Sequence, residues 1–145
     1  MAATRKKSAS YDGFTEEERS AMKEHAKELK SSRGKEDDEA AQLAKIAELP
    51  DEEREMAERI SAIVKENAPG LTPKTWYGMP GWAKNGKVVV FFQNASKFKY
   101  RYSTLGFNET ATLDDGEMWP VAYALTELTP AVEKQITALV RKAVG

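Results

Sequence analysis

The sequence feature that most constrains the fold is the tetrapeptide Lys84-Asn85-Gly86-Lys87, which precedes an apolar run from Val88 to Phe92. A two-residue hairpin turn of type I′ requires positive φ at both central positions, and Asn-Gly adopts these angles at low energetic cost. A run that is apolar at every position is typical of a central strand with both faces covered. We therefore predict an antiparallel hairpin in the middle of a sheet.

The N-terminal third of the chain has the pattern of two surface helices. Thr15 and Glu18 have the spacing of a capping box, which predicts a helix from there to about Lys30 with a thin apolar stripe. A second helix is predicted for residues 38–49, before a proline interrupts the pattern. His25 is the single histidine of the chain, and we interpret it as a solvated residue of the first helix.

Two further predicted helices have continuous apolar faces. Asp51 begins a third helix that closes near Ala68, and Thr129-Pro130 supplies a capping residue and a first-turn proline to the last helix. In both segments apolar residues recur at spacings of three and four. We expect these two helices to pack firmly on the sheet.

A third strand is predicted after the hairpin, because six residues alternate between cationic and aromatic side chains: Lys97, Phe98, Lys99, Tyr100, Arg101 and Tyr102. We expect residues 94–96 to form a three-residue loop before it, since a two-residue loop would bring aromatic and cationic side chains onto one face. Residues 121–125 are expected to form a last short strand.

These elements together predict an α+β fold. An antiparallel sheet of about five strands is packed by a middle and a C-terminal helix, and an N-terminal helical extension wraps an edge or end of the sheet. A chain of 145 residues suits one domain. We assign residues 14–145 to it, with the extension at 14–50 and the core at 51–145, and expect residues 1–13 to be a disordered basic tail.

Composition narrows the partners that are expected. The chain has no cysteine, which excludes disulfides and thiolate metal sites and suits a reducing compartment. Its 22 basic and 23 acidic residues leave a charge of −1, so we expect no general attraction to nucleic acid or to an anionic membrane. No stretch approaches the roughly 18 apolar residues of a membrane span. We therefore expect a cytoplasmic protein.

The known catalytic patterns are missing from the sequence. It contains no phosphate-binding glycine loop, no dinucleotide fingerprint and no nucleophile elbow, so we favour a non-enzymatic protein over an enzyme. Carboxylates at Asp114, Asp115 and Glu117 are candidate ligands for a hard cation such as iron. The alternative is an ordinary turn.

A ligand-binding face is predicted from the strand register. Pairing across the hairpin turn sets Trp82 opposite Val89, so that Trp82 is expected to share a sheet face with Phe91, Lys99 and Arg101. Such a face is an apolar floor rimmed by cations, which suits a small anionic or aromatic ligand. A solvated sheet face is the alternative interpretation.

The segment Lys74-Thr-Trp-Tyr-Gly-Met-Pro-Gly-Trp82, with the hairpin turn and Lys97 after it, resembles the YdhG-like family of small bacterial domains. Tyr77-Gly78-Met79-Pro80 and Lys97 match the pattern of that family, from about Met56 to the last helix. The resemblance implies an α+β fold, and one family member has been described as a frataxin-like iron chaperone. Many relatives have a histidine shortly after the lysine, where this chain has Lys99.

Two functional hypotheses follow. The first is a non-enzymatic binding module for a small anionic or aromatic ligand or a protein partner, with Tyr77 and Trp119 as further candidate ligand-binding residues. It predicts that Arg101→Ala weakens anion binding by about 1 to 3 kcal/mol. The second is an iron-binding chaperone that uses the acidic loop, as the resemblance implies.

Overall fold

The structure, a computed structural model, describes residues 13–30 and 34–145. Within that part of the chain, helices and a five-stranded antiparallel sheet form an α+β fold, as the sequence predicts. The helices are α2 (Glu16–Lys30), α3 (Lys35–Ala47), α4 (Asp51–Asn67) and α5 (Pro130–Ala143), and a short 3-10 helix, η1, spans Ala95–Lys97. The strands are β1 (Thr72–Trp76), β2 (Met79–Lys84), β3 (Lys87–Gln93), β4 (Ser103–Phe107) and β5 (Ala122–Leu125). The predicted tail falls outside the described residues, except for its last position.

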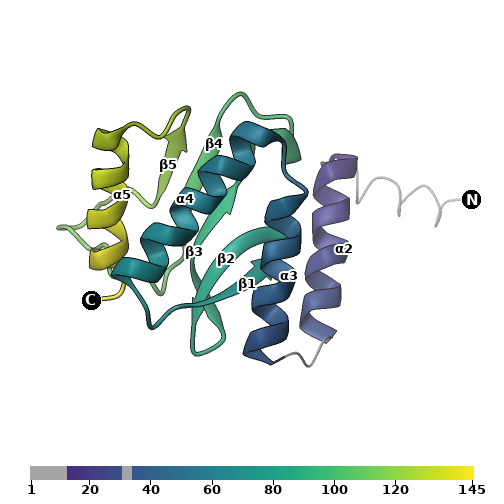
Figure 1. The fold of residues 1–145 in the computed structure, drawn as a ribbon, viewed down its shortest axis with the longest axis horizontal. Helices are drawn as coiled ribbons and strands as arrows, with labels where there is room; N and C mark the ends of the chain where they lie inside the picture. The colour runs from purple at the N-terminus through teal and green to yellow at the C-terminus, as the bar shows by residue number, and fades with distance from the viewer. Residues whose placement is uncertain (1–12, 31–33) are drawn as a thin grey trace, which may run out of the picture.

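The sheet is an antiparallel meander in which each strand pairs with the next along the chain. Figure 1 shows α4 running across one face of this sheet, with α5 beside the β5 end and α3 and then α2 beside the β1 end. No helix in residues 13–30 and 34–145 is long and apolar enough to cross a membrane. The helical extension thus lies at one edge of the sheet.

The helix boundaries agree with local sequence signals. Thr15 and Glu18 form the predicted capping box, because the Thr15 N–H donates to Glu18 Oε1 at 2.8 Å and the Glu18 N–H donates to Thr15 Oγ1 at 3.0 Å. Thr129 Oγ1 accepts the Val132 N–H at 3.2 Å, with Pro130 as the first residue of α5. Each cap satisfies a backbone donor that a helix start otherwise leaves free.

The core lies between the sheet and the helices α3, α4 and α5. Both strongly amphipathic helices bury their apolar faces on it, as predicted, and the buried side chains include Ile60, Ile63, Val64, Phe92, Leu105, Ile136 and Val140. Helix α3 adds Ile46 to this core. It is also tied to the sheet by the buried Gln42, whose Nε2 donates to the carbonyl of Gly81 at 2.7 Å. The first half of the predicted extension is therefore peripheral, whereas α3 is part of the core.

The hairpin at Asn85-Gly86 is confirmed, but its register is not the predicted one. Both turn residues have positive φ, 53° and 81°, as a type I′ turn requires. A β-bulge follows, so that Trp82 pairs with Val90 and Ala83 pairs with Val88. Val89 is the extra residue, and the Asn108 N–H donates to its carbonyl at 2.9 Å. The predicted pairing of Trp82 with Val89 is wrong by one residue, and this moves Trp82 to the other face of the sheet.

On the sheet face opposite the main helices, aromatic rings pack over glycine residues. Phe91 pairs with Gly81 on one side and with Gly106 on the other, and its ring covers Gly106 so closely that a Cβ there would overlap it. The Trp76 ring lies 4.8 Å from the Phe91 ring. Glycine at position 106 is therefore required by the close approach of the Phe91 ring.

The predicted third strand at residues 97–102 does not form. The chain after β3 enters η1, and β4 begins only at Ser103, so the predicted three-residue loop is in fact a longer connection. Lys99 has a positive φ of 59°, and the Tyr100 N–H donates to the Ala95 carbonyl at 2.9 Å. The Tyr100 side chain is exposed instead of joining the predicted core. Cationic and aromatic side chains therefore alternate here in a segment that is an irregular loop and not a strand.

We expect Trp82→Ala to lower the free energy of unfolding by about 3 to 5 kcal/mol, as truncation of a large core side chain does. Trp82 is 2% exposed and belongs to the main core cluster. Urea denaturation followed by circular dichroism measures the change, with Tyr100→Ala as a matched control at an exposed aromatic residue. A loss below about 1 kcal/mol would show that Trp82 is not a core residue.

Candidate functional site

The predicted ligand face does not exist as one surface. Trp82 is buried in the core, whereas Phe91 lies on the opposite face of the sheet. Lys99 is exposed in the loop after η1, where its Nζ lies 3.1 Å from Glu17 Oε2 of α2. The register shift at Val89 and the missing third strand together separate these residues. The prediction of an apolar floor rimmed by cations is therefore wrong.

The other predicted ligand-binding residues are also dispersed. Tyr77 occupies the turn between β1 and β2, where its ring stacks on His25 at a centroid distance of 3.8 Å. Trp119 is partly buried against the core in the connection between β4 and β5. Arg101 lies in the loop before β4, with its guanidinium 5.1 Å from the centre of the Tyr102 ring. Of the predicted residues, only Arg101 lines the groove described below.

The candidate metal ligands Asp114, Asp115 and Glu117 are exposed in the β4–β5 connection. In the described ranges, no group of three histidine, aspartate or glutamate side chains is arranged to hold a metal ion. Iron binding by this loop stays a prediction, and no preformed cluster supports it.

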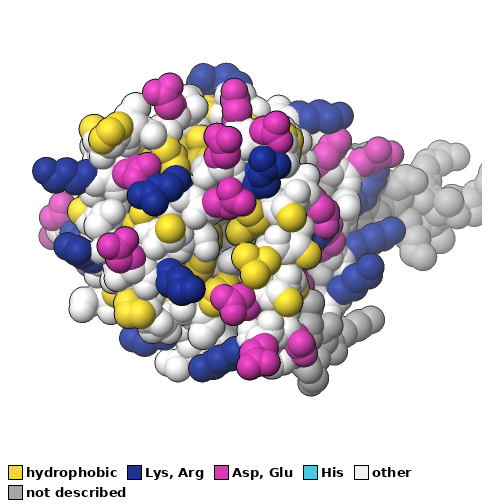
Figure 2. Space-filling view, in the orientation of Figure 1, with side chains coloured by type: hydrophobic (Ala, Val, Ile, Leu, Met, Phe, Trp, Pro, Cys, Tyr) yellow, Lys and Arg dark blue, Asp and Glu magenta, His cyan; other side chains and the backbone are white. Residues whose placement is uncertain are grey.

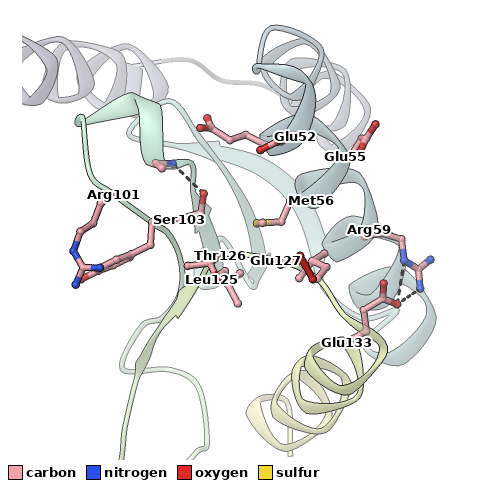
Figure 3. Close-up of a pocket in the computed structure, with 14 residues that line it drawn as sticks. Glu52, Glu55, Met56, Arg59, Arg101, Ser103, Leu125, Thr126, Glu127 and Glu133 are labelled. Carbon is pink, nitrogen blue, oxygen red and sulfur yellow. Dashed lines mark hydrogen bonds and ion pairs between the residues drawn. The ribbon is translucent and has the colours of Figure 1, made fainter.

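A groove with a volume of about 500 Å³ lies between the first half of α4, the loop before β4 and the connection from β5 to α5. Figure 3 shows Glu52, Glu55, Met56 and Arg59 on the α4 wall and Arg101 on the wall opposite. Its lining consists of Glu52, Glu53, Glu55, Met56, Arg59, Ala95, Arg101, Tyr102, Ser103, Leu125, Thr126, Glu127, Leu128 and Glu133. Segments far apart in the sequence thus converge on one site.

One wall of the groove is held by Glu53, which reaches from α4 to the turn at η1. Glu53 Oε1 accepts the side-chain amide of Asn94 at 2.7 Å, and its Oε2 accepts the Ser96 hydroxyl at 2.7 Å and the Ser96 N–H at 3.3 Å. We call these three hydrogen bonds of Glu53 the Glu53 clamp. In the same loop, Ser103 Oγ accepts the Ala95 N–H at 3.0 Å. An irregular loop is therefore fixed by hydrogen bonds to a charged group, which are stronger than those between neutral groups.

The other end of the groove is closed by an ion pair between α4 and α5. Arg59 donates from Nε and Nη2 to Glu133 Oε1, at 3.2 and 2.6 Å. This hydrogen bond lowers the pKa of Glu133 and raises the pKa of Arg59. The two charges cancel locally, so the pair positions the helices and adds little net charge to the groove.

Three carboxylates on the groove are exposed and make no hydrogen bond or ion pair with residues 13–30 or 34–145: Glu52, Glu55 and Glu127. Figure 2 shows acidic side chains gathered over the upper end of α4, where the helix begins in the view of Figure 1. Arg101 makes no ion pair among the described residues and stacks on Tyr102 instead. The floor between these groups is apolar, formed by Met56, Leu125 and Leu128. The groove therefore combines an apolar base with a negative rim.

The titratable side chains of the groove are five glutamates, two arginines and Tyr102. No histidine lines the groove, and its one serine hydroxyl, Ser103 Oγ, already accepts a backbone N–H. The hydrogen bond between Arg59 and Glu133 raises the pKa of Arg59 and lowers the pKa of Glu133, so both side chains favour their charged forms. General acid–base chemistry needs a group whose pKa is near the working pH.

Comparison with models of known families, with curated proteins and with solved structures found no match for this chain. The resemblance to the YdhG-like family rests on the motif residues alone and remains a prediction.

Sequence reasoning missed this groove because each carboxylate has a local explanation. Glu52, Glu53 and Glu55 lie in the first two turns of α4, where acids favour the helix dipole. Glu127 follows the last strand and had no recognisable pattern. No signal within the sequence shows that these residues and Arg101 line one groove, since that depends on how the helix packs on the sheet.

We predict that Glu53→Ala loosens the groove wall and lowers the free energy of unfolding by about 1.5 to 3 kcal/mol, because buried Asn94 loses its charged partner. Amide hydrogen exchange at Ser96 should accelerate, and urea denaturation gives the stability change. Glu52→Ala, at the exposed neighbouring position, is the matched control. Equal exchange at Ser96 in the two variants would contradict the clamp.

Proposed function

We propose that this chain is a non-enzymatic binding module whose groove takes a cationic ligand, namely an amino or guanidinium group on an aliphatic stem. The observation that carries this proposal is the set of three exposed carboxylates, Glu52, Glu55 and Glu127, around an apolar floor in a groove of about 500 Å³. Ligand sites of this volume typically combine apolar surface with a few oriented polar groups.

The charge of the lining sets the sign of the ligand. Five glutamates and two arginines line the groove, which leaves an excess of three negative charges. Glu133 is neutralised by Arg59, and Glu53 is bound only by neutral donors and keeps its full charge. A cation entering the groove meets a negative potential from several directions, and concave surfaces of one sign concentrate counter-ions.

The apolar floor sets the shape of the ligand. Met56 and Leu128 are partly buried and pack against the core cluster, so the groove offers fixed apolar surface. An aliphatic stem of the kind in lysine or in a linear polyamine buries its methylene groups there, while its charged end remains at the acidic rim. A compact, strongly hydrated metal ion gains nothing from this surface.

An anionic ligand at Arg101 was the expectation from sequence, and the groove does not favour it. Glu52, Glu55 and Glu127 line the same groove as Arg101, and three carboxylates repel an anion more strongly than one guanidinium attracts it at similar distances. The frataxin-like alternative needs oxygen ligands that converge on one point, and the described residues contain no such group. Both remain outcomes that the experiment below distinguishes.

Spermidine and 1,5-diaminopentane are suitable probes, and we expect both to shift the amide resonances of residues 52–59 and 125–128 in a saturable manner. Neutralising the rim in the variant Glu52→Gln, Glu55→Gln, Glu127→Gln should weaken spermidine binding at least about threefold, since each exposed ion pair contributes roughly 0.2 to 1 kcal/mol. Higher salt should weaken binding to the wild type.

The matched control neutralises three carboxylates on the exposed start of α3, with Glu36→Gln, Asp37→Asn and Glu39→Gln. It changes net charge equally and leaves the groove intact. Equal weakening in both triple variants would show non-specific attraction and defeat the proposal. Saturable shifts with acetate or ferrous iron at the same residues, and none with spermidine, would favour the anionic or the iron hypothesis instead.

A further inference from the structure

The turn between β1 and β2 binds a carboxylate through its backbone. Tyr77 and Gly78 both have positive φ, 53° and 77°, so two successive N–H groups are left free by the hairpin. Glu28 of α2 fills this position: Oε1 accepts the Tyr77 N–H at 3.0 Å and Oε2 accepts the Gly78 N–H at 3.2 Å. Consecutive backbone N–H groups of this kind form a concave anion-binding site.

Two lysines from other elements converge on the same turn. Lys97, at the end of η1, is placed so that a Cβ on Gly78 would lie 2.9 Å from its Nζ, and the same Cβ would overlap the Glu24 carboxylate. Burial lowers the pKa of Lys97, although the charge of Glu24 partly opposes this. Lys45 of α3 lies 3.2 Å from Glu24 through its Nζ. The site thus has two backbone donors and two ammonium groups around one glycine.

His25 of α2 also contacts the bound carboxylate, with its Nδ1 3.4 Å from Glu28 Oε1. The other groups that attract an anion come from the β1–β2 turn, η1 and α3, whereas the carboxylates come from α2. Glu24 and Glu28 are one helical turn apart, which places both carboxylates on one face of α2. The match is imperfect, because Glu24 Oε2 is buried and accepts no hydrogen bond within the described chain, although Lys45 is close by. A buried acceptor of this kind retains part of its desolvation cost.

Among the residues of α2 whose side chains are described, few are apolar and buried. Ala21 is its one buried apolar residue among those whose side chains are described, and its Glu17 pairs with Lys99 at the surface. A cavity of about 300 Å³ borders α2 on the side of Lys45 and Thr75, and another of about 290 Å³ borders it on the side of Trp76 and Phe91. Charged contacts therefore contribute to the attachment of α2, together with the stacking of His25 on Tyr77.

We infer that the Tyr77–Gly78 turn, with Lys97 and Lys45, is an anion-binding site for a small ligand that carries a carboxylate or phosphate group. In this structure Glu28 and Glu24 of α2 take the place of that ligand. A free anion competes with α2 for the site, so α2 acts as an internal inhibitor. This site is separate from the acidic groove and does not depend on the function proposed for it.

The test removes the internal carboxylate and supplies one from solution. In the full chain with Glu28→Ala, acetate or inorganic phosphate, titrated at constant ionic strength against sodium chloride, should shift the Tyr77 and Gly78 amide resonances saturably. We expect affinity about tenfold or more above that of the wild type, as for charge-assisted hydrogen bonds freed from an internal competitor. Adding Lys97→Met to this variant should abolish the shift.

Glu39→Ala, at an exposed carboxylate of α3, is the matched control and should behave as the wild type. If Glu28→Ala does not fold, Glu28→Gln replaces it, because the neutral amide competes poorly and the same saturable shift is expected at higher anion concentration. Folded protein without a saturable shift at Tyr77 and Gly78, for acetate and phosphate alike, would overturn the inference. A shift that survives Lys97→Met would do the same.

Discussion

The arrangement of the sheet depends on the β-bulge at Val89. One extra residue in β3 reverses which face its partner residues occupy, so that Trp82 joins Val90 and Phe92 beneath the helices. Asn108 stabilises the irregular pairing, since its backbone N–H donates to the Val89 carbonyl and its side chain donates to the Val88 carbonyl at 3.0 Å. Because Trp82 is buried, it belongs to the core and not to a binding face. The two sites proposed above both lie at the edges of the sheet.

Two glutamates on helices fix the irregular connections at those edges. Glu53 of α4 holds the turn at η1, and Glu28 of α2 holds the turn between β1 and β2. Each carboxylate accepts backbone N–H groups that no strand or helix satisfies. Their surroundings differ: Glu53 has neutral partners beside an acidic groove, whereas Glu28 shares its site with Lys97 and with Glu24, which pairs with Lys45. The groove at Glu53 thus has an excess of negative charge, whereas the two lysines and two glutamates at the β1–β2 turn balance one another.

Signals that act over a few residues were sufficient to predict most of the secondary structure. The capping residues, the Asn-Gly turn and the apolar spacing of α4 and α5 are local, and the structure confirms them. The bulge was not predictable, because an extra valine in a run of valines leaves the apolar pattern unchanged. Residues 97–102 have the alternation of a strand but lack an apolar face that the core accepts, and they form a loop.

The candidate sites were less predictable, because they depend on contacts between distant segments. Arg101 was predicted as a binding residue, but its surroundings were not. The carboxylates of α4 line the same groove only because of the way in which α4 packs on the sheet. His25 was interpreted as solvated and instead stacks on Tyr77, an arrangement that follows from the docking of α2. The negative charge of Glu52 and Glu53 at the start of α4 was explained by the helix dipole alone. That explanation gave no indication that the same residues line the groove.

The proposed preference of the groove for cations can be tested by the effect of Arg101 on spermidine affinity. Arg101 is the one lining cation without a carboxylate partner in the described chain, and it stacks on Tyr102 instead. Isothermal titration calorimetry of wild type and Arg101→Gln at low salt gives the comparison. If the groove binds cations, spermidine should bind more tightly to Arg101→Gln than to the wild type, because the substitution removes a positive charge that repels it. Weaker or unchanged spermidine binding, or acetate binding that is lost with Arg101, would contradict it.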